Sequence, residues 1–548
     1  MSNIKIPKKQ FEKEIGKLDE KMQEKIALFG TTLESFDEQE IELEIFPNRP
    51  DLLSYQGFKR SFLGFLGKQK GLKKYKINKP EKDYKVNIDS SVKNVRPYTA
   101  CAIVKGLKFN DEKIKEIVEI QEKLHTTVGR KRKKIAIGIY PLEKIKLPIT
   151  FKALEPDKIK FIPLEMNREM SGLQILQRHP TGRDYAHLLA GKTKFPIFVD
   201  AEDKVLSMPP IINSQSTGKI TEQTKDVFIE CSGFDFGILK KTLNILITTF
   251  AEMDGKIYQM ELNYKNKQIT PDLTPEKNKI SLENTNKLLG LDLNEKKLKE
   301  CLEKMGHSYD KGKVESPAWR TDILHEVDLI EDVAIAYGYE NFEAEIPEIS
   351  TIGEENPYET IKRKISNILT GLGLLEVSNY HLTNSKDQFT KMGIPEKNQK
   401  GLIEVEESKT EFNILRNDLT HYLLKIFSEN SDSEYPQKIF ETGRVFNLDN
   451  EKIKESEKLS CAIAPGNFTE LKQILEYLGR MLNKRFEIKE SENFPSHFID
   501  GRCAEILFED NSIGFLGEIH PRILKNWKIK MPVSLFEMDL EKIFESLA

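Results

Sequence analysis

Cysteine is scarce in this sequence, and no two cysteines lie close together. The five of them form no CxxC motif: Cys101, Cys231, Cys301, Cys461 and Cys503. This spacing argues against a zinc ribbon and against the disulfide framework of a secreted protein. Long apolar runs are also missing, since the most apolar stretch, around Leu243–Phe250, is far too short to span a bilayer. The charged N-terminal segment lacks the apolar region of a signal peptide, so we expect a cytoplasmic protein.

A strong excess of either charge is absent as well. The chain has 84 Lys and Arg residues against 87 Asp and Glu residues, which gives a formal net charge of −3. Because there is no broad basic field, any contact with nucleic acid must be local or shared with a more basic partner. The one dense basic run is Gly129–Lys134 (GRKRKK), which is either a solvated turn or a contact for phosphate groups.

The length of 548 residues is too great for one hydrophobic core and predicts about three to five domains. Residues 1–85 predict a mixed α+β domain in which the alternating IELEIF forms a strand. In the NRPDLLS segment that follows, Asp51 or Ser54 is expected to cap the next helix. The lysine-rich stretch Lys68–Lys85 is expected to be a linker.

The rest of the chain divides by pattern into three further parts. Residues 86–270 alternate predicted strands, such as KKIAIGIY and DVFIECSG, with predicted helices, which indicates a mixed α+β or α/β body. Residues 271–345 are mostly helical and resemble a compact winged-helix module. Residues 356–548 return to mixed structure, with an amphipathic helix at Ile361–Leu372 and a strand pair around QKIFETGRVFNL.

The segment RTDILHEVDLIEDVA, residues 320–334, concentrates negative charge. Its carboxylates are Asp322, Asp328, Glu331 and Asp332. If a helix begins near Leu324, the last three lie at i, i+3 and i+4 on one face, while apolar residues follow the same spacing on another face. A hard divalent cation such as Mg²⁺ would offset their repulsion. The alternative is that Asp322 caps the helix and that the other acids stabilise the positive end of its dipole.

This segment and four others resemble the β subunit of phenylalanyl-tRNA synthetase. RTDILHEVDLIEDVAIAYGYENF resembles the metal-binding segment of that family. NRPDLLS, KKIAIGIYPLEKI, MPPIINSQSTGKIT and GFLGEIHP resemble further family segments in the same order along essentially the whole chain. The length fits the archaeal and eukaryotic type, because the extra tRNA-binding oligonucleotide-fold module and the anticodon-binding domain of the bacterial type are missing.

The resemblance implies half of a two-subunit enzyme. It predicts that the chain works with a separate α subunit as an (αβ)₂ heterotetramer, which attaches phenylalanine to tRNA(Phe) using ATP. The adenylation site of this family lies on the α subunit, so no catalytic residue for aminoacylation is expected here. The four carboxylates match the family's Mg²⁺ positions: Asp322, Asp328, Glu331 and Asp332. In the family this ion is shared with the α subunit.

Residues 356–548 resemble a class II synthetase catalytic domain that has lost its chemistry. The segment Glu441–Phe446 (ETGRVF) lies where an ATP-clamping arginine motif would be, but no convincing partner follows it. Asp500-Gly501-Arg502 does not make the motif that grips the γ-phosphate. Phosphoryl chemistry needs several cationic groups and a metal held together. We therefore interpret this domain as a scaffold that packs against its α counterpart.

The resemblance also predicts a hydrolytic editing site in residues 86–270. An apolar pocket rejects tyrosine, which adds only a hydroxyl to phenylalanine, by only about a hundredfold. A second site that hydrogen-bonds the phenol could remove Tyr-tRNA(Phe), because phenylalanine would leave its polar groups unpaired. The candidates are Ser207, Asn213, Ser214, Glu230 and Ser232. Archaeal members of this family more often have Asp and Thr at positions 230 and 232. Glu230 and Ser232 keep the same functional groups, but the lengths of their side chains differ by about one carbon atom. The alternative is that these residues only terminate strands.

Pattern and resemblance together predict a multidomain α+β protein. The expected parts are a mixed N-terminal domain (1–85), an editing domain (86–270), a small winged-helix-like metal-binding module (271–345) and a class II synthetase-like antiparallel-sheet domain (356–548). Two other hypotheses compete with this one. The chain could be a free-standing RNA-binding or regulatory protein that kept the fold, or a self-sufficient ligase. The missing ATP motifs oppose the latter.

Overall fold

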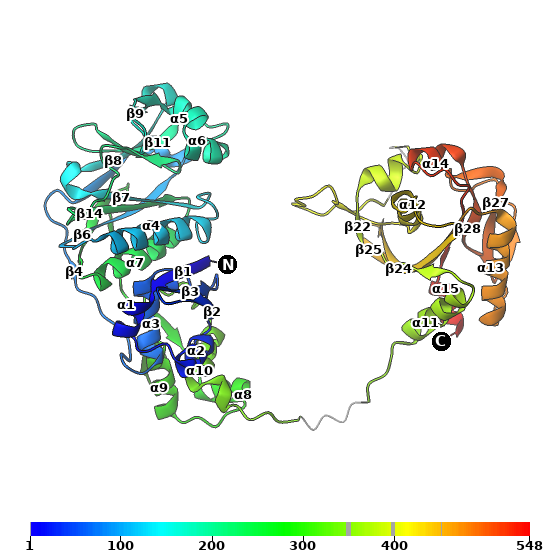
Figure 1. Cartoon of the computed structure of the whole chain (residues 1–548), viewed down its shortest axis with the longest axis horizontal. Coiled ribbons are helices and arrows are strands. Elements are labelled where there is room, and N and C mark those ends of the chain that lie inside the picture. The colour runs from blue at the N-terminus through cyan, green and yellow to red at the C-terminus, as the bar shows by residue number, and fades with distance from the viewer. Residues whose placement is uncertain (1, 347–351, 396–400, 451, 548) are drawn as a thin grey trace. The chain divides into compact units, whose positions relative to one another are not determined.

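The computed structural model describes residues 2–346, 352–395, 401–450 and 452–547. The chain forms two compact units, Met1–Ile346 and Pro347–Ala548. Figure 1 shows several sheets with helices packed on them in both units, so the predicted mixed α+β fold is confirmed. Within the described ranges, no helix is both long and apolar enough to cross a bilayer.

The first unit begins with a small three-stranded antiparallel sheet of order β1-β3-β2. Its elements are β1 (Ser2–Pro7), α1 (Lys8–Glu14), α2 (Glu20–Leu28), β2 (Thr32–Phe36), β3 (Glu40–Ile45) and α3 (Tyr55–Phe65). Ser54 caps α3, because its hydroxyl accepts a 3.0 Å hydrogen bond from the Gly57 N–H. The cap predicted at Ser54 is confirmed, whereas Asp51 is paired with Arg49 at 2.9 Å.

Two larger sheets follow and stack face to face. The five-stranded sheet has the order β4-β15-β6-β14-β7 and the seven-stranded sheet the order β13-β12-β11-β8-β5-β16-β17. The strands of the first are β4 (Ile77–Asn78), β6 (Tyr98–Lys105), β7 (Ile135–Pro141), β14 (Val227–Gly233) and β15 (Lys256–Tyr258). Those of the second are β5 (Lys85–Ile88), β8 (Ile149–Leu154), β11 (Phe195–Val199), β12 (Val205–Met208), β13 (Ile212–Asn213), β16 (Met260–Asn263) and β17 (Gln268–Thr270). The stretch predicted to be a linker thus contributes β4 to a sheet.

Helices cover the outer face of the five-stranded sheet. They are α4 (Asp111–Thr126) and α7 (Phe236–Glu252), and Figure 1 shows both on that face. A small lobe against the seven-stranded sheet contains β9 (Lys160–Phe161), β10 (Met170–Ser171), α5 (Gly172–Arg178) and α6 (Pro180–Tyr185). Side chains alternate along β14, as in any strand. Val227, Ile229 and Cys231 join the core on the helix side, whereas Phe228 joins the core between the sheets. Glu230 therefore faces the second sheet.

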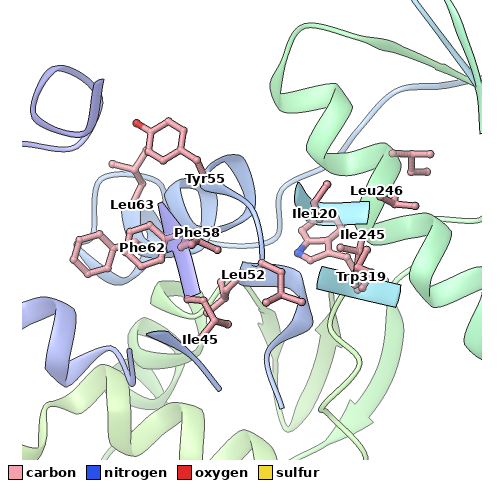
Figure 2. Close-up of a cluster of buried hydrophobic side chains, with 14 of the residues drawn as sticks. Ile45, Leu52, Tyr55, Phe58, Phe62, Leu63, Ile120, Ile245, Leu246 and Trp319 are labelled. Carbon is pink, nitrogen blue, oxygen red and sulfur yellow. The ribbon is translucent and has the colours of Figure 1, made fainter. Parts of the chain in front are cut away.

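A helical module completes the first unit. It comprises β18 (Glu276–Lys279), α8 (Leu282–Leu289), α9 (Glu295–Lys304), β19 (Ser308–Asp310), β20 (Lys313–Ser316) and α10 (Glu326–Tyr337). One continuous hydrophobic core joins this module to the N-terminal part and to the helix side of the five-stranded sheet. Figure 2 shows members of this core from α3 (Phe58), from α7 (Ile245) and from the module (Trp319). Each fully buried side chain of this size stabilises the fold by about 1.5–3 kcal/mol.

The second unit is built on a seven-stranded sheet of order β21-β24-β25-β29-β28-β27-β26, antiparallel except for the pair β21 and β24. Its strands are β21 (Leu375–Glu376), β24 (Gln437–Asp449), β25 (Lys452–Ala464), β26 (Glu487–Lys489), β27 (Phe498–Phe508), β28 (Asn511–Ile519) and β29 (Ser534–Asp539). The helices are α11 (Pro357–Gly371), α12 (Thr420–Glu429), α13 (Phe468–Met481), α14 (Pro521–Asn526) and α15 (Glu541–Leu547), and β22 (Leu382–Thr383) pairs with β23 (Ile414–Leu415). The segment predicted as a strand pair is the first arm of the β24–β25 hairpin.

Candidate functional site

Three of the predicted editing residues meet in one cavity between the two stacked sheets. Ser207 of β12 and Asn213 of β13 lie directly opposite each other in register, so their side chains share a face. Glu230 comes from β14 in the other sheet, and all three residues line a cavity of about 60 Å³. A cavity of roughly 150 Å³ accepts a benzene ring, so a complete tyrosine side chain requires these walls to move apart.

A tyrosine of the chain itself links these residues. The Tyr140 hydroxyl on β7 lies 2.8 Å from Ser207 Oγ, 3.2 Å from Glu230 Oε1 and 3.4 Å from Asn213 Oδ1. Glu230 Oε2 is buried and has no hydrogen-bond partner among the residues that the structure describes. A buried polar atom without a partner costs about 1–3 kcal/mol, so Oε2 is poised to bond a polar group that enters the cavity.

Gly138 makes the contact between Tyr140 and Glu230 possible. It lies opposite Glu230 in the register of β7 and β14. A Cβ atom at this position would lie 2.1 Å from the Tyr140 hydroxyl oxygen and 2.6 Å from Glu230 Oε1. Any other residue would therefore force the two side chains apart. A glycine inside an apolar strand pattern is a known sign of close approach, so this signal was present in the sequence.

Burial changes the acidity of Glu230. Burial raises the pKa of Glu230 to about 8, although the positive charge of Arg96 opposes this rise. At neutral pH the carboxyl group is therefore largely protonated and can donate a hydrogen bond as well as accept one. A strongly shifted carboxyl group in a cavity is typical of a functional site.

The other two predicted editing residues lie outside the lining of the cavity. The Ser232 hydroxyl accepts a 3.1 Å hydrogen bond from Arg96 Nε, and the Ser232 carbonyl accepts one of 2.6 Å from Arg96 Nη2. Ser214 is buried, and its hydroxyl lies 3.0 Å from that of Ser216. Neither serine lines the cavity, so the structure gathers only three of the five predicted residues around Tyr140.

Arg132 also lines the cavity, and sequence reasoning assigned it only to a basic run. Its guanidinium donates a 2.8 Å hydrogen bond to the Ile211 carbonyl and another of 2.8 Å to Glu122 Oε1. It also lies over the Tyr185 ring, 4.6 Å from the ring centroid. These contacts fix the segment between β12 and β13, which carries one wall of the cavity.

The acidic segment forms a buried ion-pair cluster at the start of α10. Arg320 Nη2 lies 2.6 Å from Asp322 Oδ2 and 2.9 Å from Asp332 Oδ2, and His307 Nε2 lies 2.6 Å from Asp332. Burial alone would raise the pKa of Asp332, but the Arg320 charge and the His307 hydrogen bond lower it to about 2. Asp322 does not cap the helix, since Arg320 holds its carboxylate and His325 is the N-cap.

The remaining two acids are free of such cations. Asp328 Oδ2 accepts 2.7 Å hydrogen bonds from the N–H groups of Leu324 and His325, and so completes the cap of α10. Glu331 is exposed, and its pKa is raised by partial burial and by the charges of Asp332 and Asp328. Across the described parts of the chain, no three acidic, His or Cys side chains are arranged to hold a metal ion by themselves. Asp328 and Glu331 remain available to an ion whose other ligands come from water or a second chain.

In the second unit, carboxylates pair with the arginines of the two motifs that resemble ATP-binding segments, Arg444 and Arg502. Arg444 on β24 pairs with Glu455 at 2.7 Å and with Glu457 at 3.0 Å, both on the neighbouring strand β25. Arg502 on β27 pairs with Glu518 at 2.6 Å. Both guanidinium groups thus already pair with carboxylates of neighbouring strands.

Three parts of the chain match tRNA synthetase domain families. Residues 82–253 match the B3/4 domain, residues 278–339 the tRNA synthetase B5 domain, and residues 343–540 the phenylalanyl tRNA synthetase beta chain CLM domain. The matches include the cavity, the acidic segment and the second unit. They define a component of an aminoacyl-tRNA ligase.

Individual relatives narrow this class. The phenylalanine–tRNA ligase beta subunit of Thermococcus sibiricus is 41% identical over 510 residues, which cover 91% of this chain and 90% of the relative. That of Archaeoglobus fulgidus is 38% identical over 543 residues, 98% of each chain. A crystal structure of an N-terminal fragment of the Pyrococcus horikoshii phenylalanyl-tRNA synthetase beta subunit is 38% identical, with a TM-score of 0.59, and covers 61% of this chain and 99% of the fragment. The chain belongs to the archaeal phenylalanine–tRNA ligase beta-subunit family, and a free-standing regulatory role is not favoured.

Proposed function

We propose that this chain combines with a separate α subunit into an (αβ)₂ enzyme that charges tRNA(Phe) with phenylalanine using ATP. In this assembly the α subunit carries adenylation. The second unit of the chain is a class II synthetase-like domain without ATP chemistry and serves as a scaffold, in which carboxylates already neutralise Arg444 and Arg502. A translation enzyme of this kind works in the cytoplasm.

We further propose that the cavity at Glu230 hydrolyses Tyr-tRNA(Phe). One observation carries this proposal, the arrangement of the two carboxyl oxygens of the buried Glu230. One oxygen accepts a hydrogen bond from the Tyr140 hydroxyl, and the other has no partner among the described residues. Ser207 and Asn213 line the same cavity. A tyrosine hydroxyl would supply the missing hydrogen bond, whereas a phenylalanine ring would bury the polar group unpaired. The chemistry would use a water molecule as nucleophile.

Glu230→Gln in the assembled enzyme tests the editing proposal. The variant should accumulate Tyr-tRNA(Phe), because the amide of Gln has only one oxygen, and its NH2 group cannot accept a hydrogen bond in the place of the second carboxyl oxygen. Purified Tyr-tRNA(Phe) should be hydrolysed at least about tenfold more slowly, as expected when about 1.4 kcal/mol of transition-state binding is lost. Glu143→Gln, at an exposed position, is the matched control. Equal hydrolysis by the Glu230 variant and the control would remove Glu230 from the site.

The acidic segment is proposed as the β-subunit share of a Mg²⁺ site. Asp328 and Glu331 would bind the ion, with Asp322 and Asp332 close behind them and held by Arg320. Mg²⁺ takes one or two carboxylates and keeps several waters, so two acids of this chain suffice if the α subunit completes the site. The ion would supply positive charge that stabilises the contact between the subunits.

A further inference from the structure

The basic run Gly129–Lys134 forms a loop in an unusual backbone conformation between α4 and β7. Arg130, Lys131 and Arg132 have φ values of 47°, 52° and 64°, so three consecutive residues with side chains adopt the left-handed region. Backbone hydrogen bonds hold this shape. The Lys134 N–H donates to the Gly129 carbonyl at 2.8 Å, and the Arg132 N–H donates to the His125 carbonyl at 3.0 Å. The loop therefore presents its side chains from a fixed frame, and such left-handed residues cluster at functional sites.

Four cations on this loop have no partner in the described part of the chain. Arg130, Lys131, Lys133 and Lys134 are exposed, and neither a salt bridge nor a side-chain hydrogen bond engages them there. Arg132 is the exception, because it pairs with Glu122. Four unpaired cations within five residues are conspicuous in a chain whose net charge is −3. Such a cluster attracts a polyanion.

The loop lies at the rim of the Glu230 cavity. Arg132 lines that cavity and bonds its wall through the Ile211 carbonyl. Arg130 and Lys134, on either side of it, line a separate open groove of about 1120 Å³. The two other lysines of the groove, Lys123 and Lys241, are already paired with Glu119 and Glu276. The free positive charge of the groove thus comes from the loop that also contributes Arg132 to the cavity.

We propose that the loop Gly129–Lys134 binds the phosphates of the single-stranded 3′ end of tRNA and leads the esterified amino acid into the Glu230 cavity. This inference rests on the proposed editing function. An ester at the end of an RNA strand reaches the cavity only if its last phosphates pass the rim, where their charge needs neutralising. The exposed lysine and arginine side chains of the loop supply this positive charge locally, although the protein as a whole is close to neutral.

Two double variants of the assembled enzyme test this inference: Arg130→Gln with Lys131→Gln, and Lys133→Gln with Lys134→Gln. Each contact between a cationic side chain and a phosphate of a single strand contributes about 0.7 to the slope of log affinity against log salt concentration. At about 0.15 M salt, the loss of one such contact lowers the affinity about fourfold. Each double variant should therefore raise the KM for Tyr-tRNA(Phe) hydrolysis about fifteenfold with kcat unchanged, and should lower the salt slope by about 1.4. Lys296→Gln with Lys297→Gln, on the exposed side of α9, is the control with the same loss of charge.

A shortened tRNA distinguishes the 3′ end from other partners. Binding of tRNA(Phe) that lacks its unpaired 3′ nucleotides should be the same for the loop variants and the unchanged enzyme. Equal weakening for full-length and shortened tRNA would place the loop on another part of the RNA and overturn the inference. Unchanged tRNA binding combined with a loss of affinity for polyglutamate would assign the loop to an acidic peptide, which also overturns it. If the unchanged enzyme does not hydrolyse Tyr-tRNA(Phe), the editing function fails, and the binding comparison still decides the role of the loop.

Discussion

A single carboxyl group, Glu230, is central to the chemistry proposed for the cavity. It is buried between two sheets, where a charged oxygen loses its hydration, and it is hydrogen-bonded to the Tyr140 hydroxyl. Gly138 leaves the space in which these two side chains meet. The site therefore depends on one acid, one phenol and the absence of one side chain. A proton on Glu230 is part of this arrangement, because burial favours the neutral form of the acid.

The pH dependence of folding reports that proton. The pKa of Glu230 rises from 4.5 to about 8 on folding, so the folded chain binds the proton more tightly than the unfolded chain. The contribution of Glu230 to the free energy of unfolding should then fall as the pH rises from about 4.5 to about 8, by up to about 1.4 kcal/mol per unit, and level off above that.

Urea unfolding of the chain between about pH 5 and about pH 8 measures this slope. Glu230→Gln should remove it, so that the variant gains stability relative to the unchanged chain as the pH rises. Glu143→Gln should leave the slope in place. If the free energy of unfolding changes with pH in the same way for all three proteins, Glu230 is already ionised in the folded state at pH 5. Burial would then not raise its pKa.

Much at the residue scale could be predicted from the sequence, and the rest depends on which strands become neighbours. The alternation of side chains along a strand places Glu230 and Ser232 on one face of β14. Ser207 and Asn213 are only six positions apart in the sequence, and they lie opposite each other in one hairpin. The sequence does not show that Arg96 approaches Ser232 or that Tyr140 approaches Glu230. Those contacts join residues that are 136 and 90 positions apart.

At the scale of elements, α10 is anchored by ion pairs of Arg320, a residue that precedes the helix in the sequence. Arg320 holds Asp322 two residues later, just as Arg49 holds Asp51 two residues later near the start of α3. The helix itself was predictable from its period, with a start near Leu324 and an observed start at Glu326. The partners of its acids were not, because His307 lies on the far side of a small hairpin and contacts Asp332 only after folding.

Arg320→Gln should destabilise the first unit strongly. It leaves Asp322 and Asp332 without their common cation, and breaking a buried pair typically costs about 3–5 kcal/mol. Denaturant unfolding checks this loss. Adding Asp332→Asn should recover part of it, because the uncompensated charge disappears. Arg168→Gln, at an exposed position of the same unit, should change the stability by less than about 0.5 kcal/mol. A similar effect at both arginines would contradict the account of the cluster.

At the scale of the whole molecule, the two units have separate cores, and the functions proposed for them differ accordingly. The first unit contains the Glu230 cavity and the acidic segment, and the second contains an antiparallel sheet whose motif arginines are internally paired. The sequence indicated this division through the change in pattern near residue 350. It did not indicate that the first three predicted parts share a hydrophobic core, because amphipathic patterns show which face is buried but not against what.

Assembly with the α subunit should depend on Mg²⁺ through Glu331. Removing Mg²⁺ with a chelator should shift the co-expressed complex toward separate subunits in sizing experiments, and Glu331→Gln should raise the Mg²⁺ concentration needed for half-maximal assembly by about tenfold, the effect of about 1.4 kcal/mol. Glu283→Gln, on the exposed first turn of α8, serves as the control. A Mg²⁺ titration that is the same for both variants would remove Glu331 from the ligand set.

The shared core of the first unit limits how pieces of this chain can be exchanged with those of relatives. Phe58, Ile245 and Trp319 come from parts that sequence matching separates, yet they belong to one packed cluster. A chimera joined between residues 253 and 278, at the borders of two matched families, would cut through that cluster and set foreign side chains against each other. A junction close to residue 346, where one compact unit ends, would transplant the cluster intact.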